Sequence, residues 1–127
     1  MHNIKVGSRR SEFNDRLQID HRRDIIVNKP MASAFFETNL GTVFNFHGVD
    51  TVVVTGGSTS SCVRATVVDS LSRSYGTIVP EECVADKHEA PHFANLYDMA
   101  VTYADVLSVH ETMEQLRRVL AAGGAAV

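Results

Sequence analysis

Disulfides, membrane spans and export signals are what this sequence lacks. Its two cysteines, Cys62 and Cys83, are too few for the disulfide framework of a small secreted domain, so we expect a reduced, cytoplasmic protein. No apolar run approaches the roughly 18 residues that a membrane-spanning helix needs. The N-terminal stretch MHNIKVGSRR has no apolar segment behind its basic residues, so it is not a secretory signal.

A strong excess of one charge is also missing. The formal net charge is −3, so we expect no nucleic-acid partner and no acidic-membrane partner. The glycine pair at 56–57 has neither the spaced glycines of a dinucleotide site nor the Gly-Lys-Ser/Thr of a P-loop, which makes a phosphate cradle a weak alternative. The histidines show no metal-ligand spacing, so we expect no metal and no cofactor. They are His2, His21, His47, His88, His92 and His110.

The chain contains the alternating pattern of an α/β domain. A length of 127 residues with 44% hydrophobic content predicts a single domain over residues 1–127, with a polar arm or loop at residues 1–23. We expect strands at residues 24–28, 51–55, 77–80 and 104–107, each followed by a helix. Connections of this length favour parallel crossovers, which predicts a three-layer α/β/α fold with a mostly parallel sheet.

Several element boundaries can be predicted from local signals. The apolar run at 51–55 does not alternate, which indicates a strand covered on both faces. Gly48 and Gly76 are each expected to end a helix in the left-handed conformation. Ser108 and Glu111 have capping-box spacing and open a last helix. We expect that helix to turn the side chains of Met113, Leu116 and Leu120 inward.

Cys62 is the candidate for chemistry. It lies in the first turn of a predicted helix, at the carboxyl end of the strand 51–55, where unpaired amides and the helix dipole favour thiolate over thiol. Lys29 also follows a strand, so both residues should lie along one edge of the sheet, and an amine near a thiol favours the thiolate further. The alternative is that Cys62 is a small buried hydrophobe. Cys83 has no charged helix terminus beside it and is predicted to be structural.

Four segments, taken together, resemble a known family. They are KPMASAFFETNL at 29–40, VTGGSTSSCVRAT at 54–66, IVPEECVADK at 78–87 and HFANLYDMAVTYADV at 92–106. In this order they resemble the isochorismatase-like cysteine hydrolase superfamily, and most of all its N-carbamoylsarcosine amidohydrolase branch, which includes maleamate amidohydrolases. The resemblance covers roughly residues 24–120.

The resemblance implies a set of site residues. Cys62 matches the family's nucleophile and Lys29 its lysine, and the backbone amides of Ser58 and Cys62 would form the oxyanion hole. A non-proline cis peptide of the family would fall between Gly57 and Ser58. Lys87 stands where the branch has an arginine that holds the substrate carboxylate, so it would supply a point charge instead of a bidentate fork.

The resemblance also implies an activity. We expect a cysteine-dependent amidohydrolase that cleaves a small, carboxylate-bearing amide or carbamoyl compound and releases ammonia through a covalent acyl intermediate on Cys62. The family's catalytic aspartate lies in an N-terminal portion of the domain, and we expect the N-terminal strand or strands that carry it to be missing here. We therefore expect a homo-oligomer or a complementing N-terminal segment as partner. The alternative is a truncated, non-catalytic homologue that acts as a binding or assembly module, and a redox-sensing thiol is a weaker third idea.

Overall fold

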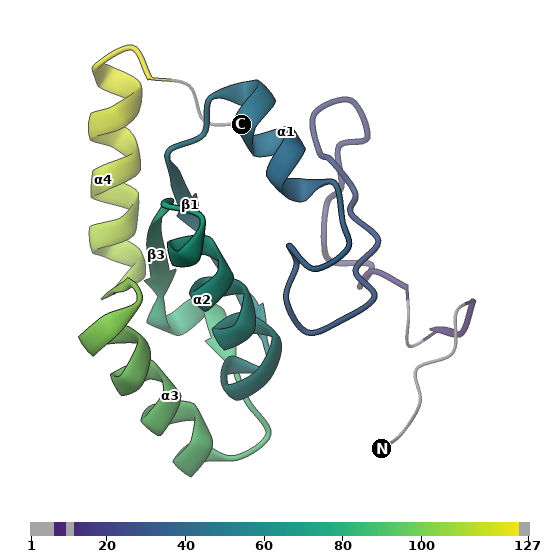
Figure 1. Ribbon diagram of the computed structural model, residues 1–127, viewed down its shortest axis with the longest axis vertical. Coiled ribbons are helices and arrows are strands. Elements are labelled where there is room, and N and C mark those ends of the chain that lie inside the picture. The colour runs from purple at the N-terminus through teal and green to yellow at the C-terminus, as the bar shows by residue number, and fades with distance from the viewer. Residues whose placement is uncertain (1–6, 10–11, 125–127) are drawn as a thin grey trace.

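Two short parallel sheets organise the chain in a computed structural model, which describes residues 7–9 and 12–124 (Figure 1). The larger sheet has the strand order β1-β3-β5, and the smaller one pairs β2 with β4, all in parallel. The strands are β1 (Thr51–Val53), β2 (Gly56–Gly57), β3 (Gly76–Pro80), β4 (Val84–Ala85) and β5 (Asp105–Leu107). In the larger sheet, Val52 pairs with Thr77 and Val79 pairs with Val106. The predicted α/β fold with a parallel sheet is confirmed.

Helices connect these strands and cover them. They are α1 (Leu40–His47), a π-helical turn (Thr59–Val63), α2 (Arg64–Ser72), a 3-10 turn (Glu81–Cys83), α3 (Glu89–Thr102) and α4 (Val109–Ala121). Helices α2 and α3 contact each other, and each connects adjacent parallel strands, so right-handed crossovers place both on one face of the sheet. Helix α4 packs against β3 and β5. No helix in the described part of the chain is long and apolar enough to cross a membrane.

The main core lies between the larger sheet and the helices α2 and α3. Its buried apolar residues are Val54, Val63, Val67, Val79, Val84, Leu96 and Met99. Three of them, Val67, Val79 and Met99, are fully inaccessible to solvent. Val54 and Val63 stand at either side of the turn that carries Cys62. The same packing that stabilises the sheet therefore also fixes the two ends of this turn.

The strand predicted at residues 24–28 was wrong. This segment is extended, but it forms no ladder with another strand. The side chains of Ile25 and Ile26 are both about half exposed. An apolar, β-branched run becomes a strand only when another strand satisfies its backbone groups, and the described residues offer none at this point. The described N-terminal loops lie on the side of the molecule away from α3 and α4 (Figure 1).

The strand predicted at residues 51–55 is shorter than expected and is not covered on both faces. It ends at Val53, and Val54 continues the ladder with one more hydrogen bond, from its amide to the Ile78 carbonyl (2.9 Å). Within the described residues β1 pairs only with β3, so it is an edge strand. The side chain of Val53 is 37% exposed. An unpaired edge of this kind can accept a further strand.

The predictions of helix ends succeeded in part. Gly48 ends α1 in the left-handed conformation, with φ 65°, and the capping box of Ser108 and Glu111 is present at the start of α4. The prediction for Gly76 was wrong, because α2 already ends at Ser72 and Ser74 adopts the left-handed conformation, with φ 68°. Gly76 instead opens β3 and donates its amide to the Asp50 carbonyl (2.8 Å).

The inward face predicted for the last helix was only partly right. Leu116 is half-buried, but Met113 is 42% exposed and Leu120 is 56% exposed. Thr112, one residue before Met113, is the buried position of α4 instead. The predicted face of Met113, Leu116 and Leu120 therefore points only partly toward the sheet.

Candidate active site

The turn between β1 and α2 carries Cys62. After β1 the chain enters the short strand β2, which pairs with β4, so that Gly57 lies opposite Ala85. The next peptide bond, Gly57–Ser58, is cis, as the family resemblance implies. The following residues form the π-helical turn Thr59–Val63, and α2 continues directly from it. Cys62 therefore lies in the turn that opens the helix, close to where the sequence placed it.

Lys29 and Cys62 lie side by side, although the segment before Lys29 is not a strand. The Lys29 Nζ atom is 3.6 Å from the Cys62 Sγ atom and also donates a hydrogen bond to the Met31 carbonyl (2.7 Å). Cys62 is half-buried and Lys29 is exposed. The contact joins residues 33 positions apart in sequence, so tertiary structure creates it. A positive charge at this distance favours the negative thiolate.

Thr66 fixes the Lys29 segment against the turn, and sequence reasoning missed it. The Ala34 amide donates to the Thr66 Oγ1 atom (3.0 Å), and the same hydroxyl donates to the Cys62 carbonyl (2.8 Å). Phe35, next in the chain, is buried and stacks on Tyr75 with ring centroids 5.9 Å apart. The available signal was a hydroxyl one helical turn after Cys62, because a threonine there can donate to the carbonyl four residues earlier.

Asp86 contacts the Cys62 turn from the other side, and sequence reasoning did not assign it. The Ser60 amide donates to Asp86 Oδ2 (2.7 Å), and the Lys87 amide donates to Asp86 Oδ1 (2.7 Å). Hydrogen bonds from the side chain and amide of Ser60 lower the pKa of Asp86 most, the Lys87 amide and nearby His92 lower it further, and partial burial opposes them. The carboxylate is therefore held in its ionised form.

Helix α3 makes two more contacts with this region. The fully buried Thr59 hydroxyl lies 2.9 Å from His92 Nδ1. Arg64, the first residue of α2, forms a salt bridge with Asp98 (2.6 Å), and this hydrogen bond raises the pKa of the arginine. The first contact joins the π-helical turn to α3 and the second joins the start of α2 to α3, so residues far away in sequence hold the turn in place.

The two remaining predicted positions are both on the surface. Lys87 is exposed, next to Asp86, so its ammonium group can reach a ligand from the solvent side, and its role in binding stays a prediction. Cys83 is exposed in the 3-10 turn and is not part of the core, and its lack of a catalytic role stays a prediction. Its 3-10 turn follows β3 directly and contacts α4, but Cys83 itself is exposed. Both cysteines are free.

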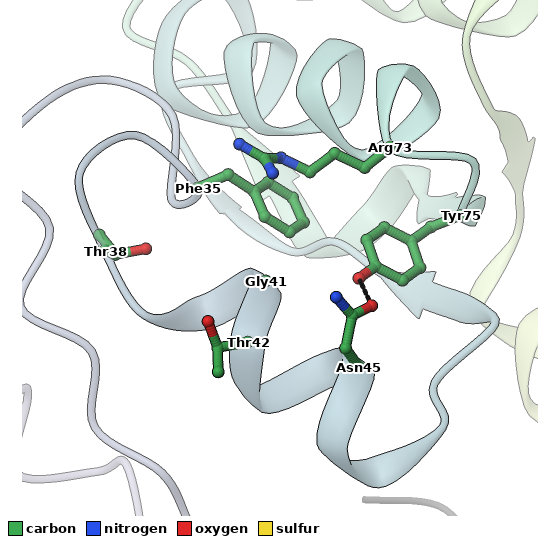
Figure 2. A pocket seen from close by; sticks show the side chains of 7 residues that line it. All are labelled: Phe35, Thr38, Gly41, Thr42, Asn45, Arg73 and Tyr75. Atoms are coloured by element: carbon green, nitrogen blue, oxygen red, sulfur yellow. Dashed lines mark hydrogen bonds between the residues drawn. The ribbon is translucent and has the colours of Figure 1, made fainter.

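Two cavities lie near α1, and neither is lined by Cys62. Figure 2 shows the smaller one, of about 400 Å³, where Arg73 and Phe35 face Thr42 and Asn45, and Asn45 accepts a hydrogen bond from the Tyr75 hydroxyl (3.2 Å). The Arg73 guanidinium lies 5.1 Å from the centre of the Phe35 ring. The larger cavity, of about 690 Å³, lies between residues 13–27, α1 and β1, and includes Val53 in its lining. Residues 7–9 and 12–124 contain no group of three or more His, Cys, Asp or Glu side chains arranged to hold a metal ion.

Comparison with known proteins agrees with this geometry. The chain is 47% identical over 94 residues to the maleamate amidohydrolase of Pseudomonas putida. The matched region covers 74% of this chain and 44% of that enzyme. It resembles the structure of an isochorismatase-like hydrolase from Alkaliphilus metalliredigens with a TM-score of 0.82 and 32% identity, over 87% of this chain and 59% of that one. It also resembles the N-carbamoylsarcosine amidase of Thermoplasma acidophilum with a TM-score of 0.72 and 32% identity, over 80% and 57% of the two chains.

The chain thus spans less than half of the curated maleamate amidohydrolase and somewhat more than half of the solved chains. The similarity begins earlier than the segments quoted from the sequence, because the isochorismatase domain matches residues 1–111. Its relatives include hydrolases that act on carbon–nitrogen bonds other than peptide bonds. On this match, the chain belongs to the isochorismatase domain family.

Proposed function

We propose that this chain is a cysteine-dependent amidohydrolase domain in which Cys62 is the nucleophile. The observation that carries the proposal is the 3.6 Å contact between Lys29 Nζ and Cys62 Sγ, in a turn that opens a helix at the carboxyl end of a parallel strand. A thiolate is the nucleophilic form of cysteine, and a neighbouring cation together with a helix N-terminus stabilises it. Ligand sites of open α/β sheets also form at this edge of the sheet.

The proposed reaction is hydrolysis of a small amide in two steps. The Cys62 thiolate attacks the amide carbonyl carbon, and the amides of Ser58 and Cys62 donate hydrogen bonds to the oxygen that becomes negative. When the intermediate collapses, the carbon–nitrogen bond breaks and the nitrogen leaves as ammonia after taking up a proton. Water then attacks the thioester, releases the carboxylic acid and restores the thiolate. Lys29 stabilises the thiolate before attack and after its release.

The substrate that we propose carries a carboxylate. Lys87 is exposed at the end of β4, one residue after Asp86, which contacts the Cys62 turn. An ammonium group there provides a single positive charge for a small anion. The maleamate amidohydrolase of Pseudomonas putida gives the most specific substrate to test, because maleamate has an amide at one end and a carboxylate at the other. A carbamoyl compound with a carboxylate is the second choice.

The proposed reaction needs a group that moves a proton to the leaving nitrogen. The two salt bridges between described residues are Arg64–Asp98 and Arg118–Glu114, so none of the described carboxylates pairs with Lys29. We therefore include a partner in the proposal: a second copy of this chain, or a separate N-terminal segment that ends a strand with a carboxylate. The unpaired edge of β1 and the cavity beside Val53 offer such a segment both backbone partners and apolar surface.

Both cysteines are free, which suits the reducing, cytoplasmic setting that we propose.

The absence of a salt bridge to Lys29 among the described residues also supports a second candidate function. Without a carboxylate beside Lys29, the chain would bind carboxylate-bearing amides or assemble with other chains, and it would not turn substrate over. Trapping the intermediate distinguishes the two functions. After maleamate is mixed with the protein and quenched in acid, peptide mapping is expected to find an acyl adduct on Cys62 and none on Cys83. Binding of maleamate with no adduct at any time point would favour the binding module.

A further inference from the structure

A second strand pairing brings a carboxylate to the Cys62 turn. Strands β2 and β4 are each only two residues long, and their pairing sets Gly57 opposite Ala85. The fit is close, because a Cβ atom added at Gly57 would lie 3.2 Å from the Ala85 carbonyl oxygen. Each strand then leads directly into a functional segment: Ser58–Ser60 on one side and Asp86 on the other.

The first turn of a helix leaves backbone amides without partners in the helix itself. Here the amides of Ser61 and Val63 both donate to the Ser58 carbonyl, at 3.1 Å and 3.2 Å. The Ser60 amide instead donates to Asp86 Oδ2 at 2.7 Å, which is a charge-assisted hydrogen bond. Asp86 thus caps the turn from a different segment of the chain, in the way that an N-cap residue usually does from within.

The orientation of this carboxylate is fixed at both oxygens. Oδ1 accepts the Lys87 amide at 2.7 Å while Oδ2 accepts the Ser60 amide, so the side chain has little freedom to rotate. The lowered pKa of Asp86 has the same cause, since its largest contribution is hydrogen bonding from Ser60. A carboxylate held in this way is suited to hold the turn in place, not to carry a proton to the substrate.

We propose that Asp86 is a positioning residue, whose carboxylate holds the Ser60 amide and thereby fixes the Ser58–Cys62 turn against β4. The importance of this turn for hydrolysis rests on the function proposed above. Cys62 lies two residues after Ser60, and the Ser58 amide lies two residues before it. A shift at Ser60 therefore moves the nucleophile and one oxyanion donor relative to each other.

The direct test is amide hydrogen exchange in the full chain without substrate. Asp86→Ala is expected to speed exchange across residues 58–63 about tenfold, since one charge-assisted hydrogen bond is lost. Asp86→Asn keeps an uncharged acceptor and is expected to show a smaller effect. Asp105→Asn, which removes an exposed carboxylate from β5, is the matched control and should leave this segment unchanged.

The pH dependence of amide exchange at residues 58–63 distinguishes positioning by the ionised Asp86 carboxylate from a general loss of structure. The pKa of Asp86 is lowered in the folded chain, so its contribution is complete above the ordinary value of 3.8 and is lost as the pH falls through the lowered value. The difference in exchange between the wild-type chain and Asp86→Ala should therefore shrink below that pH, while Asp86→Asn shows no such change. Unchanged exchange at residues 58–63 in Asp86→Ala, or equal acceleration throughout α4, would overturn the proposal.

Alkylation distinguishes a failure of the proposed function from a failure of the positioning role. The rate at which iodoacetamide alkylates Cys62, relative to Cys83, should change in Asp86→Ala even if no variant releases ammonia. If the wild-type protein does hydrolyse maleamate, Asp86→Ala should lower kcat more than it raises KM, because Asp86 does not contact the substrate. A rise in KM with an unchanged kcat would contradict the positioning role.

Discussion

At the scale of single residues, the contact between Lys29 and Cys62 is the feature on which the chemistry depends. Cys62 is half-buried and Cys83 is exposed, so exposure alone favours alkylation of Cys83. Reactivity of a thiol depends also on how well its thiolate is stabilised. The lysine side chain is exposed, so solvent screens its charge, and its effect on the thiol is smaller than in a buried pair.

The chain provides its own control for testing this contact. Lys29→Met removes the charge next to Cys62 and is expected to slow alkylation of Cys62 by iodoacetamide about three- to tenfold at neutral pH. Alkylation of Cys83 should stay the same in both proteins. Peptide mapping after brief labelling gives the two rates in one experiment. Equal rates at Cys62 with and without the lysine charge would mean that the contact does not activate the thiol.

Residue types that act locally were well predicted from sequence, and those that act across the fold were not. Gly48 and the Ser108–Glu111 box need only their own helix, and both do what the sequence indicates. Asp86 was not assigned a role, because its partner Ser60 is 26 residues away and meets it only through the pairing of β2 with β4. Such two-residue ladders carry no periodic signal that a sequence pattern can show.

At the scale of elements, β1 and β3 are the same kind of apolar strand in different positions. The sequence predicted both, but pattern alone does not state how many neighbours a strand has, and β1 turned out to be an edge. The segment at residues 24–28 failed for the same reason, since it has strand composition and no partner among the described residues. The π-helical form of the Thr59–Val63 turn was also not predicted, because its contacts with Asp86 and His92 join residues that are far apart in sequence.

Two matched valine substitutions measure this difference between strands. Val79→Ala, at a fully buried position of β3, is expected to lower the free energy of unfolding by about 2 kcal/mol, since it removes two buried methyl groups and leaves a cavity. Val53→Ala, on the partly exposed edge strand, should cost less than about 0.5 kcal/mol. Urea denaturation followed by circular dichroism gives both values, at a protein concentration low enough for the chain to be monomeric. Under that condition, a cost for Val53→Ala as large as that for Val79→Ala would mean that β1 is covered within a single chain.

At the scale of the whole molecule, the larger sheet has an edge with apolar surface beside it. Val53 is exposed on β1, and the neighbouring cavity of about 690 Å³ is lined in part by apolar side chains of α1 and of the N-terminal segment. Unpaired strand edges with adjoining apolar surface favour pairing with another chain. We therefore expect the chain to associate in solution.

A charge placed on this edge should weaken the association. Val53→Lys is expected to shift the protein toward monomer in size-exclusion chromatography with light scattering, because a lysine on an edge strand disfavours pairing. Val119→Lys, at an exposed position of α4, is the control and should have no such effect. A wild-type chain that is monomeric at every concentration, or an equal effect of the two lysines, would show that the β1 edge is not the contact.

The most direct test of the account is ammonia release from maleamate by the wild-type chain and by Cys62→Ser, measured with the oligomeric state in the same buffer. General acid–base catalysis contributes about 10²- to 10⁴-fold, so the chain without a complementing carboxylate should release ammonia slower than an ordinary enzyme by about that factor. That residual release should vanish in Cys62→Ser, and adding a partner that places a carboxylate beside Lys29 should raise it. Ammonia release that persists in Cys62→Ser would contradict the central role of the thiol. Turnover at ordinary enzyme rates by a monodisperse wild-type monomer would contradict the need for a partner.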